Sequence, residues 1–502
     1  MNVKISTEPI SSIATDCLIV TYCEGQDNVK GYTKTVDEAL EHRISQLIAE
    51  NEIKGKFGEL TVLHNWGKIP ARRTLVLGLG KETKVTVEKV RDAIGIAARH
   101  AKQKGFRNIT FGISHYYVEK KLWNPVDIIQ GVVEGAVLGT YQFKGYKKKE
   151  EQEQGIPDLV LVVDQGLRQE AIQAGIERAE AASYATNLAR DLVNEPGNKV
   201  TPAVLAERAK QIAHYRNIDI TILHKKDLEE LGMGALLGVG QASANEPKMI
   251  VMKYMGAADS KDVIGLVGKG ITFDTGGIQV KPDEGMGEMK TDMAGAAAVI
   301  ATMDAVGALR PHVNIIAVIP TCENMIAGNN LKPGDVISSF GGKTIEIIHT
   351  DAEGRLILAD GVAYAKHLGA TKLVDVATLT GAVITALGYA ATGLVTNDEQ
   401  WANDVKEAAR IAGEKVWELP NFEEYQEYID SDIADIKNDA GRPAGCIQGA
   451  IFIGAFAGET PWVHLDIAGT ATTKKDKGHH PAGATGVAVR TLLQLAIRYH
   501  AK

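Results

Sequence analysis

Seven charged residues in two short stretches of the chain are of the types that hold metal ions and activate water. Both stretches are otherwise rich in small and apolar residues, among which charged side chains are seldom buried unless they are paired or bind a metal. Four of the seven are carboxylates, and their combined charge would be balanced by two divalent cations. The set therefore predicts a two-metal hydrolytic centre. Its members are Lys269, Asp274, Lys281, Asp292, Asp351, Glu353 and Arg355.

Local sequence patterns indicate how these residues are positioned. The apolar run 263–267 ends at two glycines, which is typical of a buried strand leaving a sheet. Open α/β sheets bind their ligands at this end of their strands. In the second stretch every other residue is functional, so we expect an extended segment with Asp351, Glu353 and Arg355 on one face. The apolar pattern of 356–366 predicts a helix that follows directly, with an N-terminus that favours anions.

These residues resemble the leucyl aminopeptidase family, also called the cytosol aminopeptidase family, of dinuclear-metal peptidases. The family signature is Asn-Thr-Asp-Ala-Glu-Gly-Arg-Leu, and residues 349–356 read His-Thr-Asp-Ala-Glu-Gly-Arg-Leu. The intervals among the lysines and aspartates of the first stretch also look like those of the family, as do 194–197, 375–381 and 464–469. The resemblance is strong over 180–500 and loose before that.

The resemblance implies a role for each member of the set. It implies that the tighter metal is held by Lys269, Asp274, Asp292 and Glu353, and the more exchangeable one by Asp274, Asp351 and Glu353. A lysine ligand must be neutral, and burial beside a cation favours that form. Lys281 would stay protonated and face the oxygen that gains charge. Arg355 cannot act as a base, and the resemblance implies that it holds a bicarbonate ion that does.

The implied activity is that of a metal-dependent aminopeptidase. It would remove N-terminal residues, with Leu and other neutral residues preferred, from small peptides by attack of a metal-bridging water or hydroxide. The implied cofactors are two Mn²⁺ or Zn²⁺ ions per subunit, the implied assembly is a homohexamer, and the expected location is the cytoplasm. The implied substrate contacts are Met289, Thr378, Leu379, Gly381, Ala468 and Ala471, with backbone contacts at Leu379 and Gly381.

A binding role remains open beside catalysis. Some family members also bind DNA as regulators, and macro-like domains elsewhere bind ADP-ribose. The formal net charge of −8 argues weakly against nonspecific binding to nucleic acid. Lys269 does not belong to a phosphate-binding loop, because Gly270 stands where Ser or Thr is needed. The pair His479–His480 lacks ligand spacing, and we expect it in a solvated loop.

Position 349 departs from the family pattern, and two interpretations of it stay open. In the first, the imidazole of His349 replaces the amide of the usual Asn in a hydrogen bond that supports the loop. In the second, His349 titrates near the site, which Asn cannot do. A third role, as a direct metal ligand, is disfavoured because the implied coordination sets are already complete.

The length of 502 residues exceeds what one core usually supports, so two domains are expected. Alternating strand and helix patterns predict an N-terminal α/β domain over 1–165, which the resemblance suggests is macro-domain-like. A connecting helix is predicted over 166–192, and a larger catalytic α/β domain with a central mixed sheet over 193–502. The four cysteines are scattered, which suits a reducing compartment. No apolar run of about 18 residues appears, so no membrane span is expected.

Overall fold

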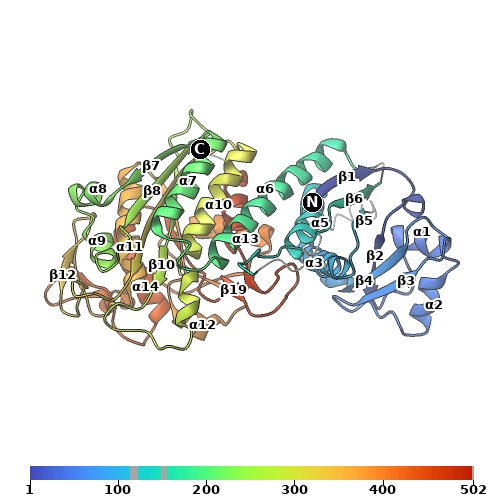
Figure 1. Cartoon of the computed structure of the whole chain (residues 1–502). Helices are drawn as coiled ribbons and strands as arrows, with labels where there is room; N and C mark the ends of the chain where they lie inside the picture. Colours follow the sequence, from blue (N-terminus) through green and yellow to red (C-terminus); the bar gives the residue numbers. More distant parts are fainter. Residues whose placement is uncertain (114–122, 148–154, 165, 500–502) are drawn as a thin grey trace. The chain divides into compact units, whose positions relative to one another are not determined.

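The chain forms two compact units, seen in a computed structural model that describes every residue except 114–122, 148–154, 165 and 500–502. Unit 1 consists of residues 1–183 and 473–482, and unit 2 consists of 184–472 and 483–502. Helix α6 (Gln169–Asn194) spans the predicted connecting segment and contains the division between the units (Figure 1). The units therefore divide inside this helix, between Ser183 and Tyr184.

Unit 1 is built on a six-stranded sheet of order β1-β6-β5-β2-β4-β3, in which only β3 runs antiparallel to its neighbour. Alternate residues of β2 face opposite sides: Cys17 and Ile19 join one core cluster, and Leu18 and Val20 join another. Both faces are thus buried under helices, which explains the continuous apolar runs of the strands. The strands are β1 (Asn2–Ser6), β2 (Cys17–Glu24), β3 (Leu60–His64), β4 (Arg73–Lys81), β5 (Asn108–Ile113) and β6 (Asp158–Val163). The α-helices are α1 (Gly31–Ala39), α2 (Arg43–Ala49), α3 (Val87–Gln103), α5 (Pro125–Gly139) and the start of α6.

Unit 2 contains a mixed nine-stranded sheet of order β16-β15-β18-β14-β9-β11-β8-β7, with β10 added beside β11. Its central strands β18, β14, β9 and β11 are parallel, so their carboxyl ends share one edge. The strands are β7 (Asp219–Leu223), β8 (Lys248–Met255), β9 (Ile264–Gly268), β10 (Gly270–Asp274), β11 (Asn314–Asn324), β14 (Lys372–Ala377), β15 (Thr392–Thr396), β16 (Val416–Glu418) and β18 (Trp462–Asp466). Two small sheets contain β12 (Val336–Ser338), β13 (Thr344–Glu346) and β17 (Ile436–Lys437), and β19 (Thr472–Thr473) and β20 (Gly483–Ala484).

Helices cover this sheet in two groups. One group has α10 packed against α7 and α15, and the other has α11 packed against α9 and α14 (Figure 1). The helices are α7 (Pro202–Arg216), α8 (Lys225–Glu230), α9 (Gly234–Gly240), α10 (Ala294–Leu309), α11 (Glu353–His367), α12 (Gly381–Leu387), α13 (Glu399–Ala412), α14 (Gly445–Ala457) and α15 (Val489–Arg498). Short 3₁₀ segments include η3 (Met286–Thr291) before α10 and η4 (Glu423–Ile429) before β17.

The helical segment Met286–Leu309 is long and apolar enough, by length and composition, to cross a membrane, which the sequence pattern did not lead us to expect. Of its most apolar window, 89% is buried inside the protein. Residues all around α10, from Ala294 to Gly307, are buried. A helix that is apolar on every side is typical of the core of a large α/β unit, and burial accounts for its composition.

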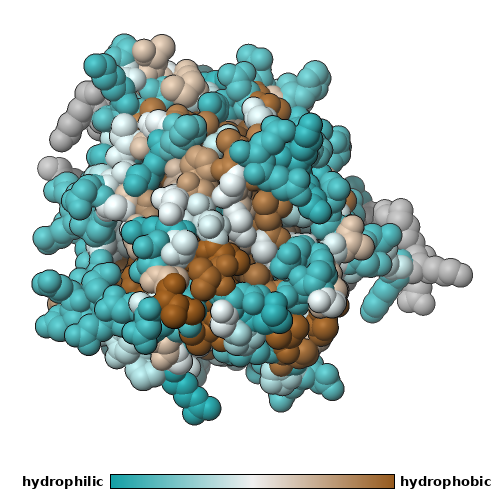
Figure 2. All heavy atoms as spheres, turned by 90° about the vertical axis from the view of Figure 1, so that its left-hand side faces the viewer, coloured by the Kyte–Doolittle hydropathy of each residue, from teal (hydrophilic) through white to brown (hydrophobic). Residues whose placement is uncertain are grey.

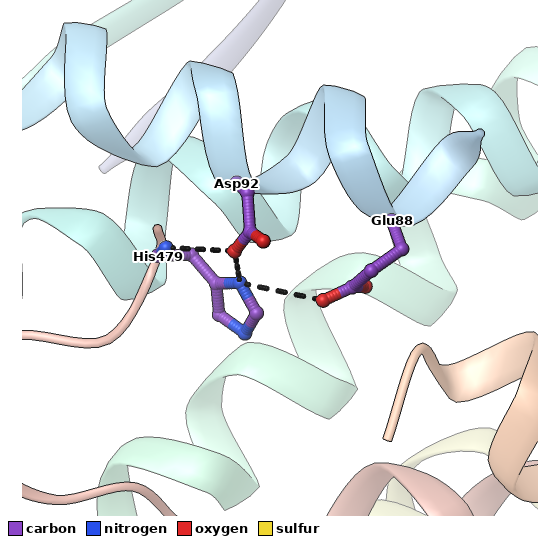
Figure 3. Close-up of side chains that lie close together, drawn as sticks. All are labelled: Glu88, Asp92 and His479. Atoms are coloured by element: carbon purple, nitrogen blue, oxygen red, sulfur yellow. Dashed lines mark hydrogen bonds and ion pairs between the residues drawn. The ribbon is translucent and has the colours of Figure 1, made fainter. Parts of the chain in front are cut away.

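The segment 473–482 packs within unit 1, on helix α3. His479 is fully buried, and its Nδ1 lies 2.7 Å from Oδ1 of Asp92 and 3.9 Å from Oε1 of Glu88 (Figure 3). Helix α3 also binds this segment through Arg99, which donates a hydrogen bond of 2.8 Å to the carbonyl of Gly478. The prediction of a solvated loop is therefore wrong for His479, because the carboxylates of α3 bind its imidazole. These contacts make the group an anchor for the segment.

Candidate metal centre

Four carboxylates and two lysines meet near the carboxyl ends of the central strands of unit 2. Lys269 directly follows β9, and Asp274 is the last residue of β10. Asp292 lies between η3 and α10, and Glu353 is the first residue of α11, two residues after Asp351. Lys281 lies in the loop after β10. Strand ends, one helix N-terminus and the loops that adjoin them thus supply the members of the group.

Lys269 is buried among acceptors. Its Nζ lies 2.8 Å from Oδ2 of Asp292, 3.0 Å from Oε1 of Glu353 and 2.9 Å from the carbonyl oxygen of Thr378. Burial alone would lower the pKa of Lys269. The charges of Asp292, Glu353 and Asp274 have a larger, opposite effect, so the pKa lies well above its usual range. The three acceptors around its Nζ thus favour the protonated form of Lys269.

Lys281 bridges the other two carboxylates. Its Nζ lies 2.7 Å from Oδ2 of Asp274 and 2.5 Å from Oδ1 of Asp351. Burial lowers the pKa of Lys281, whereas Asp274, Glu353 and Asp351 raise it above its usual range. Each of the two lysines thus pairs with two members of the carboxylate group.

The carboxylate group fits divalent cations. One oxygen from each of Asp274, Asp351 and Glu353 lies within 4.8 Å of the others. Oε2 of Glu353 is buried and makes no hydrogen bond with the described part of the chain. Burial, with Glu353 and Asp274, raises the pKa of Asp292 in spite of Lys269. Clustered, buried carboxylate oxygens with a lysine nitrogen match the hard and borderline donors that Mn²⁺ and Zn²⁺ accept.

Two residues that the sequence analysis did not single out shape this group. Nδ2 of Asn324 donates a hydrogen bond of 2.9 Å to Oδ1 of Asp274 and so orients that carboxylate. Gly354 lies against Lys269, and a Cβ at this position would approach Lys269 Cε to 2.5 Å. A larger residue at position 354 would therefore require the Lys269 side chain to shift. The role of Asn324 could not be predicted from the sequence, because a lone Asn at a strand end is most often a turn former.

The extended segment predicted for 351–355 is wrong. Glu353 begins α11, with Ala352 as its N-cap residue, so Glu353 and Arg355 lie in one helical turn. Residues two apart on a helix point in different directions. Glu353 accordingly contacts Lys269, whereas Arg355 contacts Asn438. The helix begins at Glu353 rather than after Arg355 because an acidic residue in the first turn is stabilised by the helix dipole.

The guanidinium of Arg355 is buried, and not all of its N–H groups make hydrogen bonds within the described residues. Its Nη1 donates a hydrogen bond of 2.7 Å to the carbonyl of Asn438 and lies 3.7 Å from Oδ1 of Asp439. Its Nε is buried and makes no hydrogen bond within the described residues. Burial lowers the pKa of Arg355, although Asp439 raises it. A small anion could accept the remaining N–H groups.

His349 takes a hydrogen-bonding role in the loop. Its Nδ1 accepts a hydrogen bond of 3.1 Å from the backbone N–H of Asp351. The carbonyl of His349 accepts from Nδ2 of Asn438 at 2.7 Å, and Oδ1 of Asn438 accepts from the His349 N–H at 3.2 Å. An Asn side chain offers an acceptor of the same kind. This geometry favours the interpretation in which the imidazole replaces the usual amide.

The predicted substrate residues lie on segments that border the carboxylate group. The hydroxyl of Thr378 donates to Oδ1 of Asp292 at 2.8 Å, and Gly381, the first residue of α12, has open space where a Cβ would point. Leu379 and Ala468 are brought together because both donate their backbone N–H to Oδ1 of Asp466, at 3.1 and 3.2 Å. Met289 lies in η3, and Ala471 is buried before β19.

Known proteins are similar to this chain over nearly its whole length. The catalytic-domain model of the cytosol aminopeptidase family matches residues 187–493, and the N-terminal-domain model of the same family matches residues 19–150. The chain is 45% identical to a probable cytosol aminopeptidase of Alkaliphilus metalliredigens (strain QYMF), with 99% of each chain covered.

Two solved structures resemble the whole fold at 32% sequence identity. A tomato leucine aminopeptidase mutant superposes with a TM-score of 0.89, covering 99% of this chain and 97% of the other. The bottromycin maturation enzyme BotP in complex with Mn superposes with a TM-score of 0.82, covering 96% of this chain and 99% of the other.

Proposed function

The chain belongs to the cytosol aminopeptidase family, and we propose that the carboxylate–lysine group defined above is its dinuclear metal centre. The protein is a metal-dependent aminopeptidase, a hydrolase that removes residues from the N-termini of peptides. The observation that carries the proposal is the convergence of four buried or half-buried carboxylates on Lys269 and Lys281 at one sheet edge. A manganese complex is known for BotP, which supports Mn²⁺ as one of the metals here.

One metal would be held by Lys269, Asp274, Asp292 and Glu353, and the second by Asp274, Asp351 and Glu353. Asp274 and Glu353 would serve both, which is consistent with the proximity of their oxygens to that of Asp351. Lys269 can serve only as a neutral amine, so its proton must leave as a cation binds. When bound, the two cations would polarise the scissile carbonyl and lower the pKa of a water.

The protein's own groups then bind and orient the reactants. Lys281 keeps its proton and would bind the carbonyl oxygen that gains negative charge. Arg355 would hold a bicarbonate ion, which offers the proton acceptor that the side chains of the site lack. The buried Nε of Arg355 supports this anion role. The Leu379 carbonyl would hold the peptide backbone, since its N–H is bound to Asp466.

We place the side chain of the leaving N-terminal residue in a pocket formed by Met289, Thr378, Gly381, Ala468 and Ala471. Met289 is adaptable, and the alanines and glycine leave room. Such a pocket would favour Leu or Met over Asp or Lys, with broad selectivity, because one methylene is worth only about 1–3 kcal/mol.

Replacing Ala468 with Phe is expected to change this selectivity. Ala468 is half-buried, so a larger side chain can extend into the pocket, whereas Ala471 is 4% exposed and its replacement would strain the core. Ala468→Phe should lower kcat/KM for leucine amide about tenfold or more relative to alanine amide. Steady-state assays of both amides, with metal content determined in parallel, measure this. An unchanged Leu/Ala ratio would contradict the pocket assignment.

We propose that the protein acts in the cytoplasm, as the name of its family suggests, and that it assembles as a homohexamer. Figure 2 shows apolar residues gathered on the face of unit 2 that carries α8, α9 and β12. Unit 2 also exposes large apolar side chains, including Trp417, Phe422 and Ile433, each more than 60% exposed. Exposed apolar areas of this kind mark association surfaces.

Light scattering should accordingly give a particle of six 53.9 kDa chains at micromolar concentration. We expect this assembly because association would bury the exposed apolar surface of unit 2. A monomer with full activity under the same conditions would contradict this proposal.

One cavity of unit 1 is too small to hold a nucleotide. The cavity at the ends of β2, β4 and β5 has a volume of about 20 Å³ and a mostly apolar lining that includes Leu79, Phe111 and Ile128. This volume suits a single water molecule rather than ADP-ribose.

A further inference from the structure

Asp466 is a buried carboxylate, 2% exposed, at the end of β18, and the proposed reaction does not use it. Strands β14 and β18 are parallel, and their register places Asp466 opposite Ala377, the last residue of β14. The chain leaves the sheet directly after both residues, into 378–380 on one strand and 467–471 on the other. Asp466 therefore lies where both proposed substrate segments begin.

The two oxygens of this carboxylate hold both segments. Oδ1 accepts hydrogen bonds from the backbone N–H of Leu379 at 3.1 Å and from that of Ala468 at 3.2 Å. Oδ2 accepts a hydrogen bond of 2.7 Å from the hydroxyl of Thr380. A carboxylate is costly to bury unless such donors surround it. The three contacts therefore account for a buried Asp at this position, and they join two segments that are far apart in the sequence.

Thr380 extends this arrangement to helix α12. It is the N-cap residue of α12, and its Oγ1 accepts a hydrogen bond of 3.1 Å from the backbone N–H of Val383. Its hydroxyl hydrogen points at Asp466, so the same oxygen remains available as the cap acceptor. Gly381, a proposed backbone contact of the substrate, is the first residue of α12. Asp466 thus also orients the start of this helix.

We propose that Asp466 is a positioning and specificity-determining residue, which fixes the segment that binds the peptide backbone relative to the segment that lines the side-chain pocket. Leu379 and Gly381 belong to the first segment, and Ala468 belongs to the second. This role rests on the substrate contacts proposed for these three residues. Asp466 acts through the groups that it orients and not on the reacting atoms.

Asp466→Ala removes all three contacts without adding bulk. It should raise KM for leucine amide about tenfold and change kcat by less than about threefold, because it loosens groups that bind the substrate. The ratio of kcat/KM for leucine amide to that for alanine amide should fall about threefold, since the pocket wall at Ala468 is no longer fixed. Steady-state kinetics of both amides measure these effects, and the metal content should equal that of the wild type.

Asp466→Asn is the conservative variant that should restore the wild-type behaviour. Its side-chain oxygen can still accept from the backbone N–H groups of Leu379 and Ala468, and its NH₂ group can donate to Oγ1 of Thr380. KM for leucine amide should therefore lie within about threefold of the wild-type value. A residue that only filled space would not distinguish these contacts, so an Asn variant as impaired as the Ala variant would overturn the proposal.

Asp360→Ala is the matched control. Asp360 is also a buried carboxylate, 0% exposed, and it accepts from the backbone N–H groups of Leu236 and Phe340, both at 2.8 Å. Neither of these segments carries a proposed substrate contact. Both Ala variants should therefore have a lowered melting temperature, but Asp360→Ala should keep the wild-type KM and the wild-type Leu/Ala ratio.

Three further results would overturn the proposal. The first is a wild-type KM and Leu/Ala ratio in folded Asp466→Ala. The second is an equal rise of KM in Asp360→Ala, which would indicate a general effect of lost packing. The third is loss of metal from Asp466→Ala, which would place its effect at the metal ligands. Full activity of metal-free wild-type protein would contradict the metal centre instead, so the two failures are distinguishable.

Should Asp466→Ala fail to fold, Thr380→Val tests the same arrangement with a smaller change. It removes only the hydroxyl between Asp466 and α12, and KM for leucine amide should rise about threefold at unchanged metal content. The control is Thr201→Val, which removes the N-cap hydroxyl of α7, an acceptor for the N–H of Val204 at 3.4 Å. Thr201→Val should keep the wild-type KM, and a wild-type KM in Thr380→Val would overturn the proposal.

Discussion

Asp274→Ala should lower kcat/KM at least about a thousandfold and empty both metal positions. Asp274 is buried, it is held by Asn324 and Lys281, and we propose it as a ligand of both metal ions. Removing it would leave Lys281 with Asp351 as its only carboxylate partner within 4 Å among the described residues. The expected loss corresponds to about 4 kcal/mol of transition-state stabilisation.

The matched control for this variant is Glu284→Ala. Glu284 is an exposed carboxylate in the same loop as Lys281. It should keep the activity and the metal content of the wild type. Elemental analysis beside steady-state kinetics checks both variants, and an Asp274→Ala protein with full turnover would contradict the assigned role.

Lys281→Met should lower kcat about a hundredfold to a thousandfold while metal stays bound. Methionine has a similar length but cannot stabilise negative charge on the substrate oxygen. Since Lys281 contacts Asp274 and Asp351, its loss leaves the carboxylate group more negative, which favours cations. A defect in turnover without a defect in metal content is therefore the expected signature.

Lys332→Met provides the control for Lys281→Met. Lys332 is exposed and pairs with Asp335, away from the carboxylate group. This control should behave as the wild type within about twofold, as surface substitutions usually do. If Lys281→Met lost its metal together with its activity, Lys281 would be supporting the ligands rather than the reaction.

Much of the fold could be predicted because its strands are short apolar runs. The apolar run 263–267, predicted to be a buried strand, corresponds to β9, and the helix predicted over 356–366 lies within α11. Strands buried on both faces carry continuous apolar sequence, and this pattern is local. The packing of 473–482 on α3 could not be predicted, because it depends on contacts between residues nearly four hundred positions apart.

The charged members of the site were predictable because so many ionisable residues in apolar sequence need partners. Their supporting residues were not. Asn438 fixes the loop at 348–349 and accepts from Arg355, and Asp466 fixes Leu379 and Ala468. Each is a single polar residue that acts through backbone groups of a distant segment, and no local spacing reports such a contact. The helix start at Glu353 was also missed, since alternate charged residues suit an extended segment equally well.

The central claim is that two divalent cations at this carboxylate group are required for aminopeptidase activity. Clustered carboxylates at about 5 Å repel each other by roughly 3 kcal/mol per pair at an effective dielectric of 20, so cations should bind tightly. The most direct measurement is to remove metal with a chelator and then titrate Mn²⁺ back while following leucine amide hydrolysis and bound metal together. Activity should be lost on removal and return in full at two equivalents per chain. Full turnover in protein shown to be metal-free by elemental analysis would contradict the account.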